Sequence, residues 1–343
     1  MKILFQTIGV LVQYNWALPY YLTVLEKQNS EVYVKLDTNL FSYLMGGFYY
    51  HLKQPKKLIP FFSGSGIFSR LDKILGKTKV SYKLAHFDII HLNEHHDELT
   101  NIALKTRIPK VFTFHGSLDP DHIKNVDNAC KTLKEIADKA TFVAVSQHSS
   151  NTLARYCGIR AHVIHNGVDT EIFNPSLPKI ESRKRLHLPL DKKIILWSGR
   201  VEPDKGLHKL LVAIPKIIKE RKDIMFIVKG RSINKNYLTP LKNFIKRKKL
   251  EQFIKFDLSW TPNIFKLLLY YRASDLYVHT SISEGFSLTL LEAMSSGIPV
   301  IGRNASSIPE AIGDKTLLFN DEDELAEKYS NYYQIKMYQK KLE

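Results

Sequence analysis

The sequence predicts an α/β protein with two doubly wound parallel sheets that face each other across a central cleft. Short apolar runs rich in β-branched and aromatic residues alternate with helical stretches along the chain. Their hydrophobicity is continuous rather than alternating, which is typical of parallel strands buried on both faces. The strand–helix pattern occurs twice, with about six strands each time. A chain of 343 residues is long enough for two domains with separate cores.

The expected strands fall into two sets, one in each half of the chain. Those of the first half are Lys2–Thr7, Glu31–Leu36, Phe87–Leu92, Lys110–Phe114, Thr141–Ser146 and His162–His165. Those of the second half are Ile194–Ser198, Ile224–Lys229, Phe253–Phe256, Asp275–His279, Pro299–Gly302 and Thr316–Phe319. Because doubly wound sheets bind ligands at the carboxyl ends of their strands, we expect the functional site in the cleft between the sheets.

The segment Phe173–Lys193 separates the two sets of strands and contains several prolines. It is interpreted as a linker, which predicts a domain boundary near residue 175. We therefore assign residues 1–174 to a first domain and residues 175–324 to a second domain. Residues 325–343 are expected to form a terminal helix.

The chain is strongly basic, with 50 Lys and Arg against 34 Asp and Glu and a formal net charge of +16. This excess favours an anionic partner, and a nucleotide, an acidic lipid surface and nucleic acid all fit it. No apolar run approaches the roughly 18–20 residues that span a bilayer, so we expect a cytoplasmic protein that is soluble or peripheral to a membrane. Cys130 and Cys157 fit no metal or redox spacing, and the scarcity of cysteine agrees with a reducing compartment.

The stretch Ser283–Pro299 (SEGFSLTLLEAMSSGIP) carries two carboxylates, Glu284 and Glu292, across an expected loop-to-helix junction. Ser287 is the expected N-cap of the helix. The backbone N–H groups of residues 286–289 would then face an anion at the positive end of the helix dipole. Glu292 lies among apolar neighbours, and a carboxylate in such surroundings needs a partner. Two kinds of partner remain open: a Lys or Arg side chain, or the hydroxyl groups of a bound ligand.

A second anion-binding pattern is Ser198–Gly206 (SGRVEPDKG), at the end of the first strand of the second half. Its glycines and turn would place Arg200 and Lys205 at the edge of the sheet. Arg200 is suited to forked contacts with a diphosphate, and Lys205 adds a mobile charge. Taken alone, two basic residues in such a loop are more often solvated surface charges, so the diphosphate interpretation depends on the neighbouring helix start.

Together, SGRVEPDKG, SEGFSLTLLEAMSSGIPVI and HNGVDTEIFNP resemble the motifs of family 4 of the nucleotide-sugar-dependent glycosyltransferases. The resemblance implies the GT-B fold, with two Rossmann-like domains, and a retaining transfer of a sugar from a nucleotide-diphosphate donor. It implies no obligatory metal or other cofactor. It also implies that the first domain binds the acceptor, that the second binds the nucleotide sugar, and that the terminal helix crosses back to the first domain.

The resemblance assigns roles to the residues of both motifs. Glu284 would lie by the donor sugar, and Glu292 would bind the nucleotide ribose. Arg200 and Lys205 would neutralise the leaving diphosphate, where negative charge develops. Backbone contacts to sugar or phosphate oxygens would come from Gly285, Phe286, Ser287 and Leu288.

Several weaker candidates complete the expected donor site. His115 follows a strand (TFHG) and would hydrogen bond to the sugar or leaving group, the alternative being a structural histidine. Gly9, in the loop after the first strand, would let the backbone approach the donor phosphate, although the family often has adjacent glycines there. Arg231 is a candidate contact to the nucleotide. Asn166 and Gly167 are expected to shape the hinge.

Two further stretches carry polar or charged clusters. His91 and residues 94–97 (EHHD) have the composition of a metal site but not the HExxH spacing, so a polar loop without metal is the preferred interpretation. The segment Leu40–Phe87 mixes aromatic residues with cations, and Asp72 is its only acid. This composition indicates an amphipathic element at an anionic membrane surface and a lipid or glycan acceptor, the alternative being aromatic core.

Two other functions remain open. A nucleotide-sugar epimerase or hydrolase of the same fold would convert the donor without an acceptor. A non-catalytic, basic nucleic-acid-binding relative would bind nucleic acid with steep salt dependence. The intact set Arg200, Lys205, Glu284 and Glu292 argues against such a relative, so nucleic acid is not the expected partner.

Overall fold

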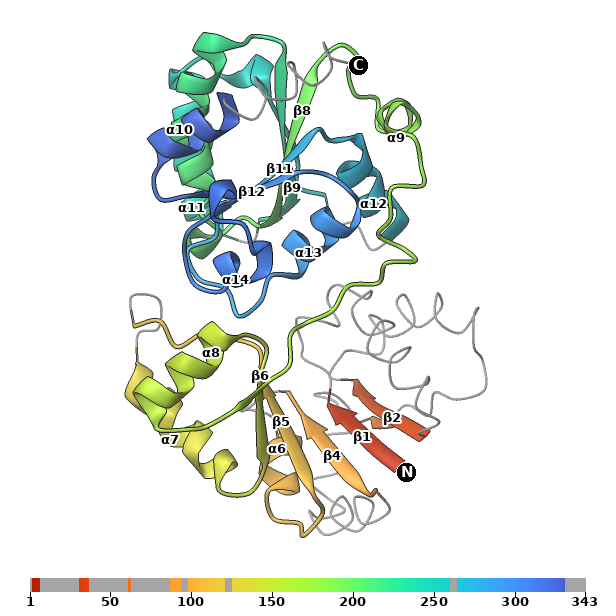
Figure 1. Ribbon diagram of the computed structural model, residues 1–343, viewed down its shortest axis with the longest axis vertical. Helices are drawn as coiled ribbons and strands as arrows, with labels where there is room; N and C mark the ends of the chain where they lie inside the picture. Colours follow the sequence, from red (N-terminus) through yellow and green to blue (C-terminus); the bar gives the residue numbers. More distant parts are fainter. Residues whose placement is uncertain are drawn as a thin grey trace. The chain divides into compact units, whose positions relative to one another are not determined.

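The computed structural model describes residues 2–6, 31–36, 61–62, 87–93, 98–120, 125–232, 234–259 and 264–330. The chain divides into two compact units, Met1–His165 and Asn166–Glu343. Each unit is built around a parallel sheet in doubly wound order, as the sequence predicts (Figure 1).

The described strands of the first unit form a sheet in the order β3-β2-β1-β4-β5-β6-β7. They are β1 (Lys2–Gln6), β2 (Glu31–Leu36), β3 (Phe61–Phe62), β4 (Ile89–Leu92), β5 (Lys110–Phe114), β6 (Thr141–Ala144) and β7 (His162–Val163). All their pairings are parallel. The short strand β3 is the one that the sequence did not predict. The strand order reverses between β1 and β4, which is the topological switch point of this sheet.

The described helices of the first unit are α6 (Glu98–Ala103), α7 (Val126–Ala137) and α8 (Gln147–Thr152), and α8 continues as the π-helical turn η1 (Leu153–Cys157). Side chains cap two of these helices: Asn125 accepts from the backbone of Asn128, and Ser146 accepts from that of Ser149. The apolar face of α7 packs Leu133 into a core shared with the strands.

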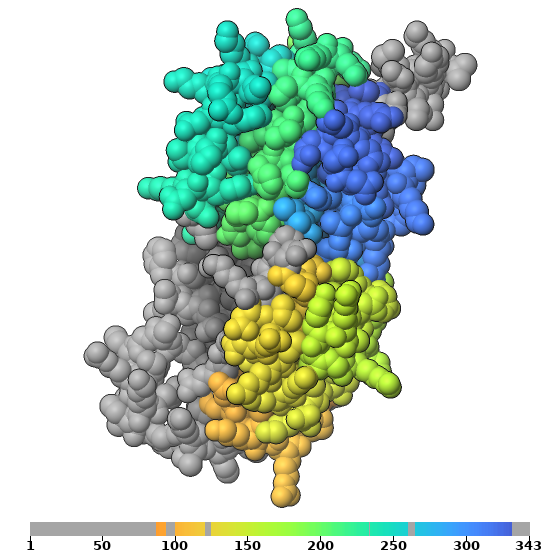
Figure 2. Space-filling model, turned by 90° about the vertical axis from the view of Figure 1, so that its left-hand side faces the viewer, coloured from red at the N-terminus to blue at the C-terminus, as the bar shows by residue number. Residues whose placement is uncertain are grey.

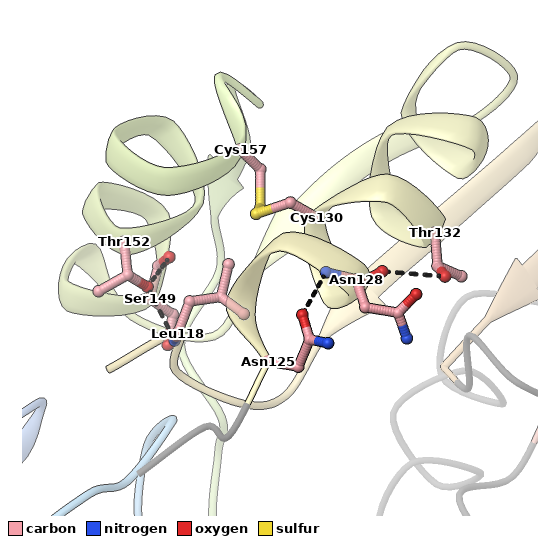
Figure 3. Close-up of a disulfide and its surroundings, with 8 residues drawn as sticks. All are labelled: Leu118, Asn125, Asn128, Cys130, Thr132, Ser149, Thr152 and Cys157. Carbon is pink, nitrogen blue, oxygen red and sulfur yellow. Dashed lines mark hydrogen bonds between the residues drawn. A yellow bond between two sulfur atoms is a disulfide. The ribbon is translucent and has the colours of Figure 1, made fainter. Parts of the chain in front are cut away.

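A disulfide joins Cys130 of α7 to Cys157 at the end of η1 (Figure 3). Both side chains are buried in the core of the first unit. Their spacing did not predict this pairing, because partners 27 residues apart are brought together only by the packing of two helices. Structural disulfides persist in oxidising surroundings, so the argument from cysteine scarcity to a reducing compartment does not hold for this pair.

The described strands of the second unit form a parallel sheet in the order β10-β9-β8-β11-β12-β13. They are β8 (Lys193–Arg200), β9 (Ile224–Arg231), β10 (Ile254–Asp257), β11 (Leu276–His279), β12 (Val300–Arg303) and β13 (Leu318–Phe319). The helices are α9 (Lys179–Arg185), α10 (Leu207–Glu220), α11 (Lys235–Arg247), α12 (Ile264–Ala273), α13 (Leu288–Ser295) and α14 (Ile308–Ile312).

Helices cover both faces of this second sheet (Figure 1). Ile195 and Trp197 of β8 point into the core shared with α10 and α11. The alternate residues Ile194 and Leu196 point into a separate core shared with α12 and α13. Burial on both faces explains the continuous hydrophobicity of the strand sequences.

The segment that follows residue 165 packs on the second unit. Phe173 is buried in its core, and Arg272 Nε donates to the carbonyl oxygen of Asn174 at 2.7 Å. In α9 the buried guanidinium of Arg183 donates to a carboxylate oxygen of Asp275 at 2.6 Å. Much of the segment expected as a linker is therefore held against this unit.

Residues 322–330 form a helix beside α10, visible as the blue segment next to green in Figure 2. Lys209 of α10 donates to Glu322 at 2.9 Å, and Tyr329 lies in the core of the second unit. The described part of the expected terminal helix thus belongs to this unit. Residues 331–343, which were expected to cross back, lie outside the described residues.

Some other predictions also fall outside the described residues. They concern the loop with Gly9, most of the aromatic and basic segment Leu40–Phe87, and residues 94–97. Within the parts of the chain that the structure describes, no helix has the length and apolarity needed to cross a bilayer.

Candidate active site

Four of the predicted donor-site residues lie on β8, on α13 and on the loops that follow β8 and β11. Arg200 ends β8, and Lys205 follows in the short 3-10 helix η2 (Pro203–Lys205). Glu284 lies in the loop after β11, and Glu292 lies in α13. The strand order reverses between β8 and β11, so these residues gather at the topological switch point of the second sheet.

The loop that carries Lys205 is held against the segment after β11 by main-chain contacts. The backbone N–H of Ile282 donates to the Asp204 carbonyl at 2.8 Å, and the Thr280 hydroxyl donates to the Lys205 carbonyl at 2.9 Å. Gly206 has a φ of 66°, and a Cβ there would lie 2.1 Å from the Thr280 carbonyl oxygen. Only glycine fits so close an approach in this conformation. These contacts therefore hold the loop after β8 and the loop after β11 in a fixed arrangement.

Lys205 and Glu284 form a mostly buried ion pair. Lys205 Nζ donates to Glu284 Oε1 at 2.9 Å, and the two side chains are 17% and 14% exposed. Burial opposes the charge of each group, but their mutual attraction outweighs it. The pKa of Glu284 is held well below its usual range, and the pKa of Lys205 is raised, with Asp204 contributing. Both groups are charged at neutral pH.

Two hydroxyl groups that the sequence did not single out hold the backbone of Glu284. The Glu284 N–H donates to Ser306 Oγ at 3.0 Å. Its carbonyl oxygen lies 2.7 Å from Ser306 Oγ and accepts from Ser307 Oγ at 3.1 Å. Ser306 has a φ of 54°, a left-handed conformation that non-glycine residues rarely adopt. The sequence did not predict this conformation, because serine has no preference for it.

Arg200 and Arg231 end the neighbouring strands β8 and β9 and are partners in the parallel register. Arg200 Nη1 contacts Glu202 Oε2 at 2.6 Å, and its guanidinium lies 3.7 Å from Asp204. Its side chain is 41% exposed. Arg231 is exposed as well. Two accessible guanidinium groups thus lie at the same edge of the sheet as Lys205.

Glu292 is fully buried, and the described residues give it no cationic partner. Tyr271 Oη donates to Oε2 at 2.6 Å, while Oε1 has no hydrogen-bond partner. Burial raises the pKa of Glu292 to about 8. Of the two partners that the sequence left open, an ion pair is therefore not found among the described residues, and one carboxyl oxygen has no hydrogen-bond partner.

The start of α13 lies beside these carboxylates. Ser287 is the N-cap residue, as predicted, and it is buried together with Gly285 and Phe286. Leu288 is half-buried. Asn166, expected at a hinge, donates from Nδ2 to the Phe286 carbonyl at 3.0 Å and so fixes this turn from within the second unit.

Polar side chains on β8, β11 and α12 form a buried group that the sequence reasoning missed. Ser198, Tyr271, Tyr277 and His279 are all at most 6% exposed. Tyr277 and His279 are two residues apart on a strand, so they point to the same face of the sheet. That alternation of polar residues within the apolar run Leu276–His279 was the available signal.

His115 lies in the first unit, directly after β5. Its Nε2 is 2.8 Å from Asn93 Oδ1, and His91 Nε2 is 2.7 Å from Thr113 Oγ1. Burial lowers the pKa of His115 to about 3, with His91 contributing, and that of His91 to about 4. Both rings are neutral at physiological pH, which suits hydrogen bonding rather than proton transfer. Among the described residues, no group of three or more His, Cys, Asp or Glu side chains is arranged to hold a metal ion.

Two family models match the sequence. A model described as glycosyl transferases group 1 matches residues 178–342, and one described as glycosyltransferase family 4 matches residues 50–172. The first match lies within the second unit, and the other covers part of the first unit and ends just past the division between the units.

Curated relatives match shorter stretches. The chain is 32% identical over 166 residues to the lipopolysaccharide core biosynthesis mannosyltransferase LpsB of Rhizobium meliloti, an alignment that covers 48% of this chain and 46% of LpsB. It is 29% identical over 241 residues to the alpha-monoglucosyldiacylglycerol synthase of Streptococcus pneumoniae, with 66% and 53% covered. The chain spans about half the length of these curated relatives.

Solved structures match over nearly the whole chain. HepE of Anabaena in complex with UDP-glucose superposes with a TM-score of 0.76 at 23% identity, covering 98% of this chain and 91% of HepE. A sucrose-phosphate synthase of Thermosynechococcus elongatus gives 0.71 at 17% identity, with 97% and 90% covered. At these identities the likeness concerns the fold, and the predicted GT-B fold with two Rossmann-like units is confirmed.

The buried carboxyl group of Glu292 predicts a specific pH dependence of stability. Unfolded, it has a pKa near 4.5, and folded a pKa of about 8. Its stabilising contribution is complete below pH 4.5 and is lost as the pH rises toward 8, because the unfolded chain releases the proton first. Relative to Glu292→Gln, wild-type unfolding free energy should fall by up to about 1.4 kcal/mol per pH unit over this range.

Urea titrations of both proteins at pH 5, 6, 7 and 8 measure this difference. Glu181→Gln, on the exposed side of α9, is the matched control and should track the wild type at every pH. Parallel profiles for wild type and Glu292→Gln would contradict the assignment of a raised pKa.

Proposed function

Because the chain belongs to family 4 of the glycosyltransferases, we propose that it transfers a sugar from a nucleotide-diphosphate sugar to an acceptor. The proposed transfer retains the anomeric configuration of the sugar. NMR of the product tests this by showing its anomeric configuration. The proposal rests on one observation. At one sheet edge, the loop that carries Lys205 lies near the buried carboxyl group of Glu292, one of whose oxygens has no hydrogen-bond partner. A nucleotide-diphosphate sugar offers both the anion and the hydroxyl groups that such a site needs.

Arg200 and Lys205 bind the diphosphate in this proposal. Negative charge develops on the departing diphosphate oxygen, and fixed cations stabilise it most where water is scarce. Lys205 meets this condition because it is mostly buried. The carboxylates of Glu202, Asp204 and Glu284 hold the two cations in place.

Glu292 binds the ribose. Acidic side chains accept hydrogen bonds from ribose hydroxyl groups in other Rossmann-like folds. A ribose hydroxyl that donates to Oε1 would supply the partner that this buried oxygen lacks. The ribose contact would then offset part of the cost of burying the carboxylate.

The other proposed donor contacts rest on position within the second unit and, for residues of the first unit, on the sequence motifs alone. We assign the sugar side of the site to Glu284 and a nucleotide contact to Arg231. His115 hydrogen bonds to the sugar or leaving group, for which its neutral ring is suited. The backbone contacts come from Gly285, Phe286, Ser287 and Leu288, and the proposal for Gly9 rests on sequence.

We further propose that the acceptor is lipid-linked and that the protein works at the cytoplasmic surface of a membrane, with the first unit binding the acceptor. Support comes from the basic and aromatic segment Leu40–Phe87 and from the relatives named as acting on diacylglycerol and lipopolysaccharide core. Cytoplasmic leaflets carry the anionic lipids that attract such segments. Co-sedimentation with acidic liposomes should fall when Lys53, Lys56 and Lys57 are neutralised, and unchanged binding would count against the membrane proposal.

Nucleotide recognition is tested first by a thermal-shift panel of UDP, GDP and ADP sugars. A ligand at 100 times its Kd should stabilise the protein by about 2.7 kcal/mol. Glu292→Ala should weaken binding of the preferred nucleotide about 2- to 10-fold, because Glu292 is protonated at neutral pH and a hydrogen bond between neutral groups is worth about 0.5–1.5 kcal/mol. Wild-type affinity in this variant, measured by calorimetry, would remove Glu292 from the ribose site.

Lys205→Ala should act on the rate instead. Loss of one preorganised charge at the leaving group costs about 10²- to 10³-fold in kcat at saturating donor. Lys209→Ala is the matched control, since Lys209 pairs with Glu322 on the helix of residues 322–330, outside the proposed site. Equal kcat values for Lys205→Ala and the control would refute the role of Lys205.

A further inference from the structure

The two glutamates of the proposed donor site are joined by a line of buried polar groups. Tyr271 Oη donates to Glu292 Oε2 at 2.6 Å. Ser198 Oγ lies 3.2 Å from Tyr271 Oη and 3.3 Å from Tyr277 Oη. Ser198 is thus placed between the two tyrosine hydroxyl groups.

The line continues from Tyr277 to the other glutamate. Tyr277 Oη lies 3.3 Å from His279 Nδ1, and its ring stacks on the imidazole with 5.9 Å between centroids. His279 Nε2 lies 3.5 Å from Glu284 Oε1. This nitrogen is buried, on a side chain of low exposure, and it has no hydrogen-bond partner of its own.

The protons along this line have a consistent direction. A neutral His279 that carries its proton on Nε2 would present that proton to Glu284 and leave Nδ1 to accept from Tyr277. The Tyr271 proton is committed to Glu292. Ser198, in the middle, then supplies its proton to either tyrosine oxygen. Tyr277 Oη is also placed to donate to Thr289 Oγ1 at 3.0 Å, so its link to His279 is one of two positions open to its proton.

We propose that His279 is a positioning residue for Glu284, whose imidazole becomes the main partner of that carboxylate when a donor diphosphate draws Lys205 away. This inference rests on the proposed function. In this structure Lys205 Nζ contacts Glu284 Oε1 at 2.9 Å, and His279 Nε2 lies 3.5 Å from the same oxygen. A buried carboxylate that lost Lys205 and had no second donor would be strongly destabilised.

The groups around His279 are consistent with its proposed role as a partner of Glu284. The charged groups that face it are Glu284 from the following loop, with Lys205 and Asp204 behind it on η2. Tyr277 on its own strand completes its polar neighbours, and Thr289 of α13 lies 3.0 Å from Tyr277 Oη. Among the described residues, Lys205 is the one lysine or arginine paired with Glu284, and the Ser281 side chain also hydrogen bonds to this carboxylate.

The first test needs no donor. We expect His279→Leu to lower the Tm of Lys205→Met about 2–4 °C more than it lowers the Tm of the wild type, because in Lys205→Met the Glu284 carboxylate has lost its lysine partner and depends on His279 and the Ser281 side chain. The extra loss should disappear when Glu284→Gln is added to both backgrounds. Equal Tm changes in the two backgrounds would overturn the proposal.

The second test separates positioning from binding, with UDP and UDP-glucose as the probes. His279→Leu should lower UDP-glucose turnover about tenfold or more while the Kd for UDP stays within about twofold, since the proposed contacts to the diphosphate and ribose remain. His279→Gln, whose amide places a donor near the position of Nε2, should restore most of the turnover. Wild-type turnover in His279→Leu would overturn the proposal. Turnover in His279→Gln as low as in His279→Leu would overturn it as well. A wild-type protein that binds neither probe would argue against the proposed donor site, and the Tm comparison would still decide the role of His279.

Discussion

The ion pair between Lys205 and Glu284 is the interaction on which the geometry of the site depends. Its two loops leave neighbouring strands, and the charges meet because main-chain contacts around Gly206 already fix the loops. A mostly buried pair gains little net stability, since desolvation offsets most of the attraction. Removing one partner without replacement is costly, however. Such a pair is therefore suited to a change of partners, in which an incoming anion binds the lysine and another donor hydrogen bonds to the carboxylate.

The two glutamates of one motif are held in opposite protonation states. Glu284 has cations and donors around it and stays ionised, whereas Glu292 has a single tyrosine hydroxyl and holds its proton to about pH 8. Eight residues separate them in sequence, so the difference comes from what the neighbouring strands and helix bring to each. Opposite environments for paired carboxylates commonly accompany different roles within one site.

The fold and much of the site could be predicted from the sequence because their signals are local. Continuous apolar runs predicted the parallel strands, and glycines beside Arg200 and Lys205 indicated a tight loop at a strand end. The partners of those residues could not be predicted, since they come from distant segments. Ser306 meets Glu284 only through the packing of α14 against β12, and Tyr271 reaches Glu292 from another helix. The pairing of Cys130 with Cys157 depended in the same way on helix packing.

Several departures from ordinary packing in the second unit lie at this sheet edge, although left-handed residues such as Lys249 and buried hydroxyl groups without a partner, such as that of Ser182, also occur elsewhere in the unit. Ser306 adopts a conformation that costs a non-glycine residue about 1–3 kcal/mol. Glu292 and His279 each bury a polar atom without a partner. A sequence selected for stability alone would lose these features, since apolar residues of similar size would fit the same positions. Their presence around one ion pair is explained if the missing partners are supplied by a ligand and by the rearrangement that the ligand causes.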